Sequence, residues 1–366
     1  MPFAQRKGVT FRADGGTDIG LGHIIGSLRL ARLLRNELGV DVTFRTKDDR
    51  TGDHSIGNNG DNHYIVKLIR SHGFHCELFQ SATPAQDFAL TLESIAGRGD
   101  RTVIVNFCDR DIIAYTGSYK LLRDGGVCLI FQDNAVAPSF WDGDLLFNPL
   151  PHPDEPGYNP AEIPNCLDGL EYFLLEDEHY RLAENRRNPG EAVNRVLVAM
   201  GGGDAVNHTE TILRGLAKAR FRGFVDVVIG GVNPHEMTLR RTLGDTGLRG
   251  EINRAVSDLP SRIQQADIGF SALGLTTYEM GFLALPVILI PGSSFNRGVA
   301  ELYVQRIPTA VVLPEEEVNP DGVAELFTRL QSGYQIRLAM SRAGVTIGSC
   351  RQDVVNAFRS TLEFLG

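Results

Sequence analysis

The chain has 366 residues, of which 42% are hydrophobic and 22% charged, and this length and composition suit two globular domains and argue against a disordered protein. Its net charge of −9 argues against a general binder of nucleic-acid backbones, which presents a basic surface, so no nucleic-acid partner is expected. The same charge is compatible with a local basic pocket for one diphosphate.

Membrane and metal signals are weak. No run approaches the ~20 apolar residues that cross a bilayer, and residues 1–7 lack the apolar core of a secretion signal. We therefore expect a cytoplasmic protein without stable membrane insertion. The five cysteines show no CxxC spacing, which favours reduced, buried thiols over a disulfide framework or a zinc site.

Strands and helices are predicted to alternate along the first half, which is typical of α/β domains with parallel sheets. Runs of β-branched and aromatic residues predict strands at 9–13, 41–45, 76–79, 102–107 and 127–131. Apolar residues at helical spacing predict a helix between the first two strands: Ile24, Leu28, Ala31, Leu34 and Leu38. The segment 149–164, rich in Pro, Asp and Asn, is predicted to be irregular.

The second half repeats the scheme, with strands predicted at 195–200, 224–229, 268–272, 287–290 and 310–313. The pattern breaks at 185–194, so we expect domains at 1–188 and 189–366, with the last helix, about 352–364, packing back on the first domain. Two Rossmann-like halves would place ligands in facing crevices, at the carboxyl ends of their strands.

The first candidate site is the glycine-rich run from Asp14 to His23, which follows a strand and precedes a helix. Gly20 and Gly22 permit close approach of a ligand, and a helix N-terminus offers free N–H groups to anions. The helix dipole disfavours imidazolium, so His23 is a candidate neutral base that Asp14 could orient. The alternative is that His23 only fills the loop.

A dinucleotide-binding turn is a weaker interpretation of the same run. The segment from Gly20 to Gly26 is a near match to GxGxxG, but its glycines begin several residues after the strand ends. In addition, no acidic residue clearly ends the second strand at Arg45.

The second candidate site is the strand–helix junction at 271–279. Gly274, Thr276, Thr277 and neighbouring N–H groups suit a diphosphate, and Glu279 could accept both hydroxyls of a ribose. A capping box, Thr276-x-x-Glu279, explains the same residues without a ligand.

Three other segments are expected to serve the same ligand. Gly201, Gly202 and Asp204 follow a strand and have the same two interpretations, ligand loop or helix start. Asn296 and Arg297 could bring an amide and a cation to the sugar or phosphates. Main-chain groups near Val256 are the candidates for contact with the base.

Several of these pieces, in this order, resemble a known family. The opening pieces, Phe11-Arg12-Ala13-Asp14 and Ile19-Gly20-Leu21-Gly22-His23 with Leu30-Ala31, are similar to the UDP-sugar hydrolases of pseudaminic acid biosynthesis. Later matching pieces are Ala199-Met200-Gly201-Gly202 with Asp204, Ala266-Asp267, Gly274 with Thr276-Thr277 and Glu279, and Asn296. The resemblance covers nearly the whole chain and extends to GT-B glycosyltransferases, including the one that adds N-acetylglucosamine to the peptidoglycan lipid precursor.

The resemblance implies a GT-B fold, two Rossmann-like domains with parallel sheets facing an interdomain cleft, and no metal or other cofactor. His23 matches the histidine that activates water to attack the anomeric carbon with inversion. Thr276, Thr277 and Glu279 match positions for the diphosphate and ribose, and Asn296 matches a substrate contact.

Three departures from the family pattern fall in the half that binds the acceptor. Gly26 stands where the family usually has an arginine, Asn106-Phe107-Cys108 stands where it has Asp-His-Tyr, and the stretch 50–62 is longer and more polar than usual. From the resemblance we expect hydrolysis of a nucleoside-diphosphate sugar, with UDP as the nucleotide. Because of the departures we keep two alternatives open. These are a GT-B glycosyltransferase that uses a UDP-sugar donor and a catalytically silent nucleotide-sugar-binding protein.

Overall fold

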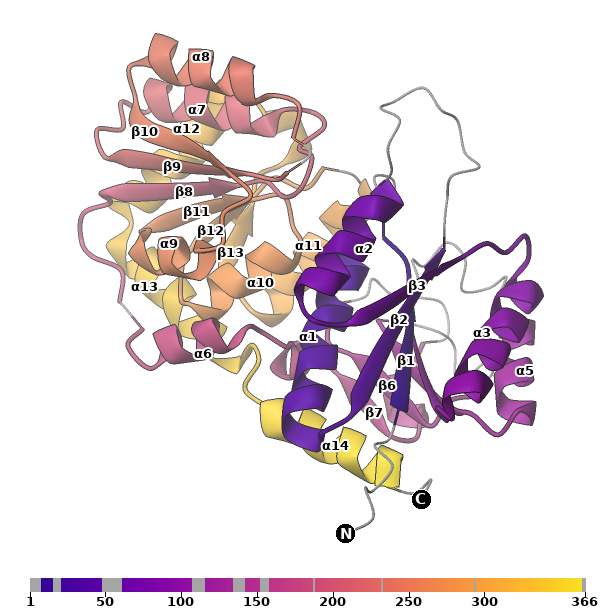
Figure 1. Ribbon diagram of the computed structural model, residues 1–366. Coiled ribbons are helices and arrows are strands. Elements are labelled where there is room, and N and C mark those ends of the chain that lie inside the picture. The colour runs from indigo at the N-terminus through magenta and orange to yellow at the C-terminus, as the bar shows by residue number, and fades with distance from the viewer. Residues whose placement is uncertain are drawn as a thin grey trace. The chain divides into compact units, whose positions relative to one another are not determined.

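The computed structural model describes residues 8–15, 21–47, 61–106, 116–133, 142–151, 158–186, 188–231, 233–292 and 294–363. The chain forms two compact units (Figure 1). The first comprises Met1–Leu174 together with Cys350–Gly366, and the second comprises Leu175–Ser349. The division lies earlier in the chain than position 188, where the sequence predicted the boundary.

The first unit is built on a seven-stranded parallel sheet with the order β3-β2-β1-β4-β5-β6-β7. Its strands are β1 (Gly8–Ala13), β2 (Asp41–Lys47), β3 (His75–Phe79), β4 (Thr102–Asn106), β5 (Cys128–Gln132), β6 (Leu145–Asn148) and β7 (Cys166–Asp168). Its helices are α1 (Gly22–Leu38), α2 (Asp61–Ser71), α3 (Pro84–Arg98), α5 (Tyr119–Asp124) and α14 (Arg351–Glu363). The first five predicted strands are confirmed, whereas β6 and β7 were not predicted.

Helices cover both faces of this sheet. α1, α2 and α14 share one apolar cluster with the strands, while α3 and α5 pack on the other face (Figure 1). The predicted helix is α1, and its stripe residues Ile24, Leu28 and Leu34 are fully buried. It ends at Gly39, whose left-handed φ of 64° is a conformation that glycine adopts at low cost. The final helix, α14, contributes Phe358, whose ring meets that of Phe147 edge-on at 5.8 Å.

The second unit has a six-stranded parallel sheet with the order β10-β9-β8-β11-β12-β13. Its strands are β8 (Arg195–Ala199), β9 (Phe224–Ile229), β10 (Arg249–Arg254), β11 (Ile268–Ser271), β12 (Val287–Leu289) and β13 (Ala310–Val312). Its helices are α6 (Asp177–Ala183), α7 (His208–Lys218), α8 (Glu236–Thr246), α9 (Leu259–Gln265), α10 (Leu275–Phe282), α11 (Ser294–Arg306), α12 (Pro320–Ser332) and α13 (Tyr334–Ala343). The five predicted strands are confirmed, and β10 was missed.

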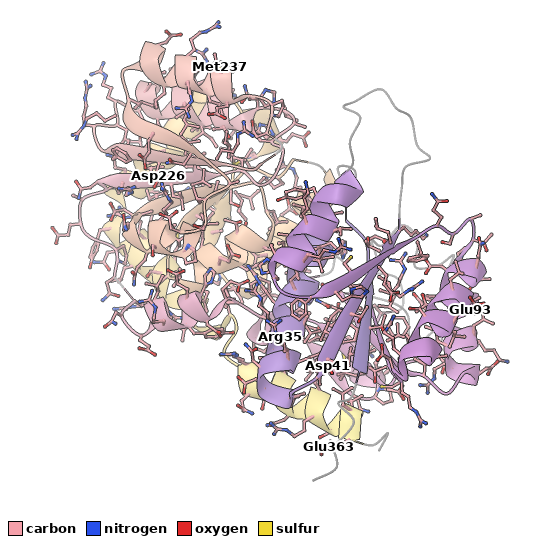
Figure 2. The ribbon with its side chains drawn as sticks, in the orientation of Figure 1. Arg35, Asp41, Glu93, Asp226, Met237 and Glu363 are labelled. Atoms are coloured by element: carbon pink, nitrogen blue, oxygen red, sulfur yellow. The ribbon has the colours of Figure 1, made fainter. Side chains whose placement is uncertain are left out.

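Two buried polar clusters stabilise the second unit. Asp226 lies within the sheet (Figure 2) and accepts hydrogen bonds from Arg195 at 2.7 Å and Arg262 at 2.8 Å. The buried guanidinium of Arg337 donates to main-chain carbonyls of Gly190 and Glu191, and to two carbonyls at the end of α12. Since buried charges need partners, both clusters tie elements together that are distant in sequence.

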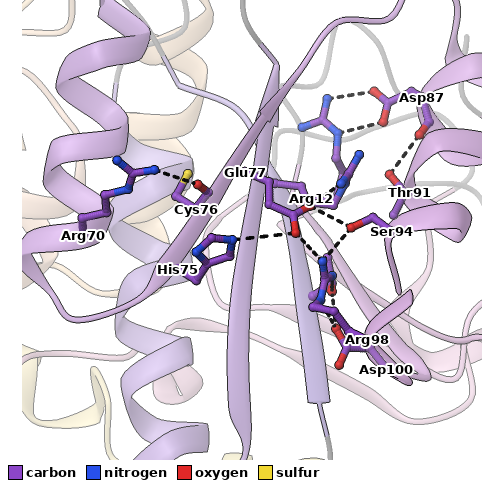
Figure 3. Close-up of polar contacts among 12 residues, drawn as sticks. Arg12, Arg70, His75, Cys76, Glu77, Asp87, Thr91, Ser94, Arg98 and Asp100 are labelled. Carbon is purple, nitrogen blue, oxygen red and sulfur yellow. Dashed lines mark hydrogen bonds and ion pairs between the residues drawn. The ribbon is translucent and has the colours of Figure 1, made fainter. Parts of the chain in front are cut away.

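Another buried cation, Arg12 of β1, organises the carboxyl edge of the first sheet (Figure 3). Its guanidinium donates to both carboxylate oxygens of Asp87 at 2.8 and 2.9 Å. It also donates to both oxygens of Asp14 at 2.6 and 2.7 Å. Burial raises the pKa of Asp14, but the charge and hydrogen bonds of Arg12 outweigh burial, so that this pKa lies below its ordinary value of 3.8. Asp14 is therefore the ionised partner of a buried arginine.

We predict that Asp14→Asn lowers the free energy of unfolding by about 3 kcal/mol, because it removes one charge from a buried ion pair. Asp124→Asn, at an exposed position of α5, is the matched control and should change little. Because the pKa of Asp14 is depressed, its stabilisation is present above about pH 4 and is lost as the pH falls through the folded-state value. Urea unfolding should show the wild-type advantage at pH 7 and a smaller one at pH 3. Equal stability of wild type and variant at pH 7 would contradict this role.

Candidate functional site

In each unit the strand order reverses beside the first strand, at the β1–β4 pair and at the β8–β11 pair. At such a point the connections leave the carboxyl ends of two neighbouring strands in opposite directions, and ligands of open α/β sheets bind there. The first unit places α1 and the end of β4 at this edge. The second unit places the start of α10 there, directly after β11.

His23 lies in the first turn of α1 and is half-buried. Its Nδ1 atom lies 2.6 Å from Oδ1 of Asn106, the last residue of β4. The helix begins after Leu21, which has no polar side chain to cap it, and its first turn holds no acidic residue. The imidazole therefore stands at the positive end of a helix dipole and contacts a neutral amide.

Asn106 belongs to a polar cluster at the ends of β4 and β5. It is fully buried, and its Nδ2 atom donates to Ser27 Oγ at 3.1 Å and to Asp133 Oδ2 at 3.4 Å. Ser27 in turn donates to Gln132 Oε1 at 3.4 Å. From the sequence, Asn106 stands out only as a departure from a family pattern. A signal was available in the sequence, because Asn106 is a polar residue near the end of an otherwise apolar predicted strand.

Asp14, the other predicted catalytic residue, is placed differently from what the sequence suggested. Its carboxylate is held by Arg12, and it also accepts from the main-chain N–H of Lys47 at 2.9 Å. The partner of His23 in this cluster is Asn106. Gly22 is exposed at the start of α1, while Gly20 lies outside the described residues.

In the second unit, α10 starts at Leu275, and Gly274 at its N-cap has no side chain to cap the free N–H groups. Thr276 lies inside the helix, so the capping box does not form. Thr277 is buried and its hydroxyl lies 2.9 Å from that of Ser271, which ties the helix to β11. Glu279 is 5% exposed, whereas Gly274 is exposed and Leu275 and Thr276 are half-buried, so 274–276 is the accessible part of this helix start.

The start of α7 shows the opposite arrangement. Asp204 accepts hydrogen bonds from the main-chain N–H groups of His208 at 2.9 Å and Thr209 at 3.0 Å. Its carboxylate thus occupies the positive end of the helix where an anionic ligand would bind. Gly201 and Gly202 are exposed, and the backbone of Gly202 lies against Gly230, where an added Cβ would come within 2.2 Å. Between these two helix starts, the geometry favours α10 for a diphosphate.

The remaining candidates lie on other loops and helix starts of the second unit. Val256 is half-buried just after β10, beside Ala255 with its left-handed φ of 48°. Asn296 and Arg297 lie in the first turn of α11, and the Arg297 guanidinium donates to the carbonyl of Leu313 at 3.4 Å. The contacts therefore give Arg297 a structural partner within its own unit.

The described residues also bear on membrane crossing and metal binding. In that part of the chain, no helix combines the length and apolar character that a membrane crossing requires. Over the same residues, no group of three or more His, Cys, Asp or Glu side chains is arranged to hold a metal ion.

No family model matches the sequence. An uncharacterized protein of Methanocaldococcus jannaschii, MJ1062, is 23% identical over 83% of this chain and 60% of its own length, so the chain spans less than two thirds of that relative. The spore coat polysaccharide biosynthesis protein SpsG of Bacillus subtilis is 23% identical over 91% of each chain.

Solved structures show the fold more clearly. MurG of Acinetobacter baumannii superposes with a TM-score of 0.65 at 14% identity, over 97% of this chain and 99% of its own. Phytolacca americana UGT2, in complex with UDP-2-fluoro-glucose and pterostilbene, gives 0.64 at 12% identity, over 98% and 99%. The expected fold class is confirmed: the chain has two Rossmann-like parallel-sheet domains with the GT-B fold of these proteins.

Because Asp204 caps α7, we predict that its substitution affects stability and not nucleotide binding. Asp204→Ala should lower the free energy of unfolding by about 1 kcal/mol, because two N–H groups lose their acceptor. It should leave the affinity for UDP unchanged in calorimetry, since the carboxylate serves its own helix. Asp245→Ala, at an exposed position of α8, is the control. A large loss of UDP affinity with unchanged stability would show that Asp204 contacts the ligand.

Proposed function

We propose that this protein is a GT-B enzyme that transfers the sugar of a nucleoside diphosphate sugar, with a UDP-sugar as donor. The observation that carries the proposal is His23, a histidine with its Nδ1 held by a buried amide in the first turn of a helix. The fold adds support, because UGT2, a structure with that fold, is in complex with a UDP-sugar analogue. The name of SpsG favours a place in polysaccharide biosynthesis.

The second unit is proposed to bind the nucleotide through α10. Its uncapped N-terminus would receive the diphosphate, with Thr276 as a side-chain donor. Negative charge develops on the diphosphate as the sugar departs, and oriented N–H groups stabilise such charge without reorganisation. Glu279, one turn further into the helix, would contact the ribose after a local adjustment of its buried side chain.

His23 of the first unit is proposed as the general base. An acceptor O–H group would donate its proton to the imidazole while its oxygen attacks C1 of the sugar. The bond between C1 and the diphosphate oxygen breaks, and its electron pair leaves with UDP. Direct displacement of this kind inverts the configuration at C1, and no metal takes part in the step as proposed.

The acceptor distinguishes two versions of this reaction. Transfer to a hydroxyl of a sugar or glycan is favoured because the solved structures that share the fold include CalG4, the calicheamicin glycosyltransferase, with a TM-score of 0.67. Hydrolysis, in which water takes the place of the hydroxyl, is the second candidate. It is favoured by the glycine loop and His23, which resemble the UDP-sugar hydrolases. Both versions need the same base, so the fate of the sugar must decide between them.

The test is turnover of a panel of UDP-, GDP-, CMP- and TDP-sugars, with and without glycan acceptors, in ¹⁸O-labelled water. A transferase should release UDP only when an acceptor is present. A hydrolase should release UDP without an acceptor, and the ¹⁸O label should be found in the free sugar. His23→Ala should lower kcat by about 10²–10⁴-fold, the usual contribution of a general base. It should leave UDP affinity intact.

The matched control is His75→Ala, since that histidine side chain of β3 is 63% exposed. Label in the phosphate would indicate pyrophosphate cleavage and contradict attack at carbon. Wild-type turnover by His23→Ala would remove this residue from the mechanism.

A further inference from the structure

The contacts of Asn106 bear on which imidazole nitrogen of His23 carries the proton. We infer that Asn106 is a positioning residue: it holds neutral His23 in the tautomer with Nδ1 protonated and leaves the lone pair on Nε2. The structural part of this inference stands on the polar cluster alone. Its consequence for catalysis rests on the proposed function.

The orientation of the Asn106 amide is set by its partners. One end of the amide lies 3.3 Å from the main-chain oxygen of His23 and 3.4 Å from Oδ2 of Asp133. A main-chain carbonyl can only accept a hydrogen bond. The end that faces the His23 carbonyl must therefore be the NH₂ group, because an amide oxygen there would face another oxygen without a proton between them. The carbonyl oxygen of the amide then points to the imidazole.

The tautomer of neutral His23 follows from this orientation. Oδ1 of Asn106 lies 2.6 Å from Nδ1, and an amide oxygen has no proton to donate. The hydrogen bond forms only if Nδ1 carries the proton. Because a neutral imidazole has one N–H group, Nε2 keeps its lone pair and is the atom that would take a proton from the acceptor.

Neighbouring residues hold the amide in place. Ser27, one turn after His23 on α1, donates to Gln132 and so offers its oxygen lone pairs to Asn106. Gly26 is part of the same arrangement, because a Cβ at this position would lie 3.2 Å from Nε2 of Gln132. Two of the departures noted from sequence, at Gly26 and Asn106, thus belong to one cluster. A side chain at position 26 would press on the residue that orients Ser27.

The amide also sets the charge beside the base. Asn106 is neutral, and within the described residues the acidic side chain bonded to this cluster is Asp133, on the loop after β5. Asn106→Asp would add a second carboxylate to the cluster and place it against the imidazole. Opposite charge favours imidazolium, so this variant should raise the pKa of His23 and move the acidic limb of the pH–rate profile to higher pH.

The direct test is long-range ¹H–¹⁵N NMR on the full chain labelled with ¹⁵N-histidine, with His23 assigned by its absence in His23→Ala. At a pH where the imidazole is neutral, wild-type Nδ1 should show the shift of a protonated nitrogen and Nε2 that of an unprotonated one. Asn106→Ala should shift the population toward the Nε2-protonated tautomer. A wild-type spectrum with Nε2 protonated overturns the inference, and this readout does not depend on how the variants fold.

Kinetics then tests the catalytic consequence. Asn106→Ala should lower kcat at least about tenfold while KM for the sugar nucleotide stays unchanged, because the base is misoriented but the donor site is intact. Asn185→Ala, at an exposed position, is the matched control. If the tautomer is as inferred but His23→Ala turns over normally, the proposed function fails and the positioning role stands. If His23 is essential but its Nδ1 is unprotonated, the positioning role fails alone.

Discussion

The central constraint is that a helix beginning at the carboxyl edge of a parallel sheet leaves its first N–H groups without intrahelical acceptors. The chain meets this need in two ways. At α7 the carboxylate of Asp204 supplies the acceptor, whereas α1 and α10 begin after Leu21 and Gly274, which have no side chain for the task. A ligand anion fits α10, and a neutral base fits α1. The roles proposed for the two units, the base at α1 and the diphosphate at α10, rest on these uncapped helix starts.

Buried charge imposes a second constraint on the same edge of the first sheet. Arg12 is fully buried and takes both Asp14 and Asp87 as partners, so these carboxylates serve the stability of the strand ends. Asp14 is committed to Arg12 and to the N–H of Lys47, while the neutral amide of Asn106 contacts His23. The described side-chain hydrogen bond of His23 is thus made to a neutral amide.

Local patterns predicted much of the fold. Apolar spacing identified α1, and buried runs followed by glycine identified β1, β8 and β11. β6, β7 and β10 were not predicted because they are short or half-exposed. The unit boundary was not predicted because it depends on contacts between distant residues, such as that of Arg29 with the Leu174 carbonyl. The contact of Asn106 with His23 was not predicted for the same reason. The two residues lie 83 positions apart in sequence, and no periodicity links residues that meet only in the folded domain.

The most direct test of the account is hydrogen–deuterium exchange along the whole chain with UDP, uridine or no ligand. UDP should slow exchange in the first turn of α10, at 275–278, whereas uridine, which lacks the diphosphate, should not. No comparable slowing is expected at the start of α7, where Asp204 already binds the N–H groups. UDP binding that protects other segments and leaves 275–278 unchanged would contradict the central claim.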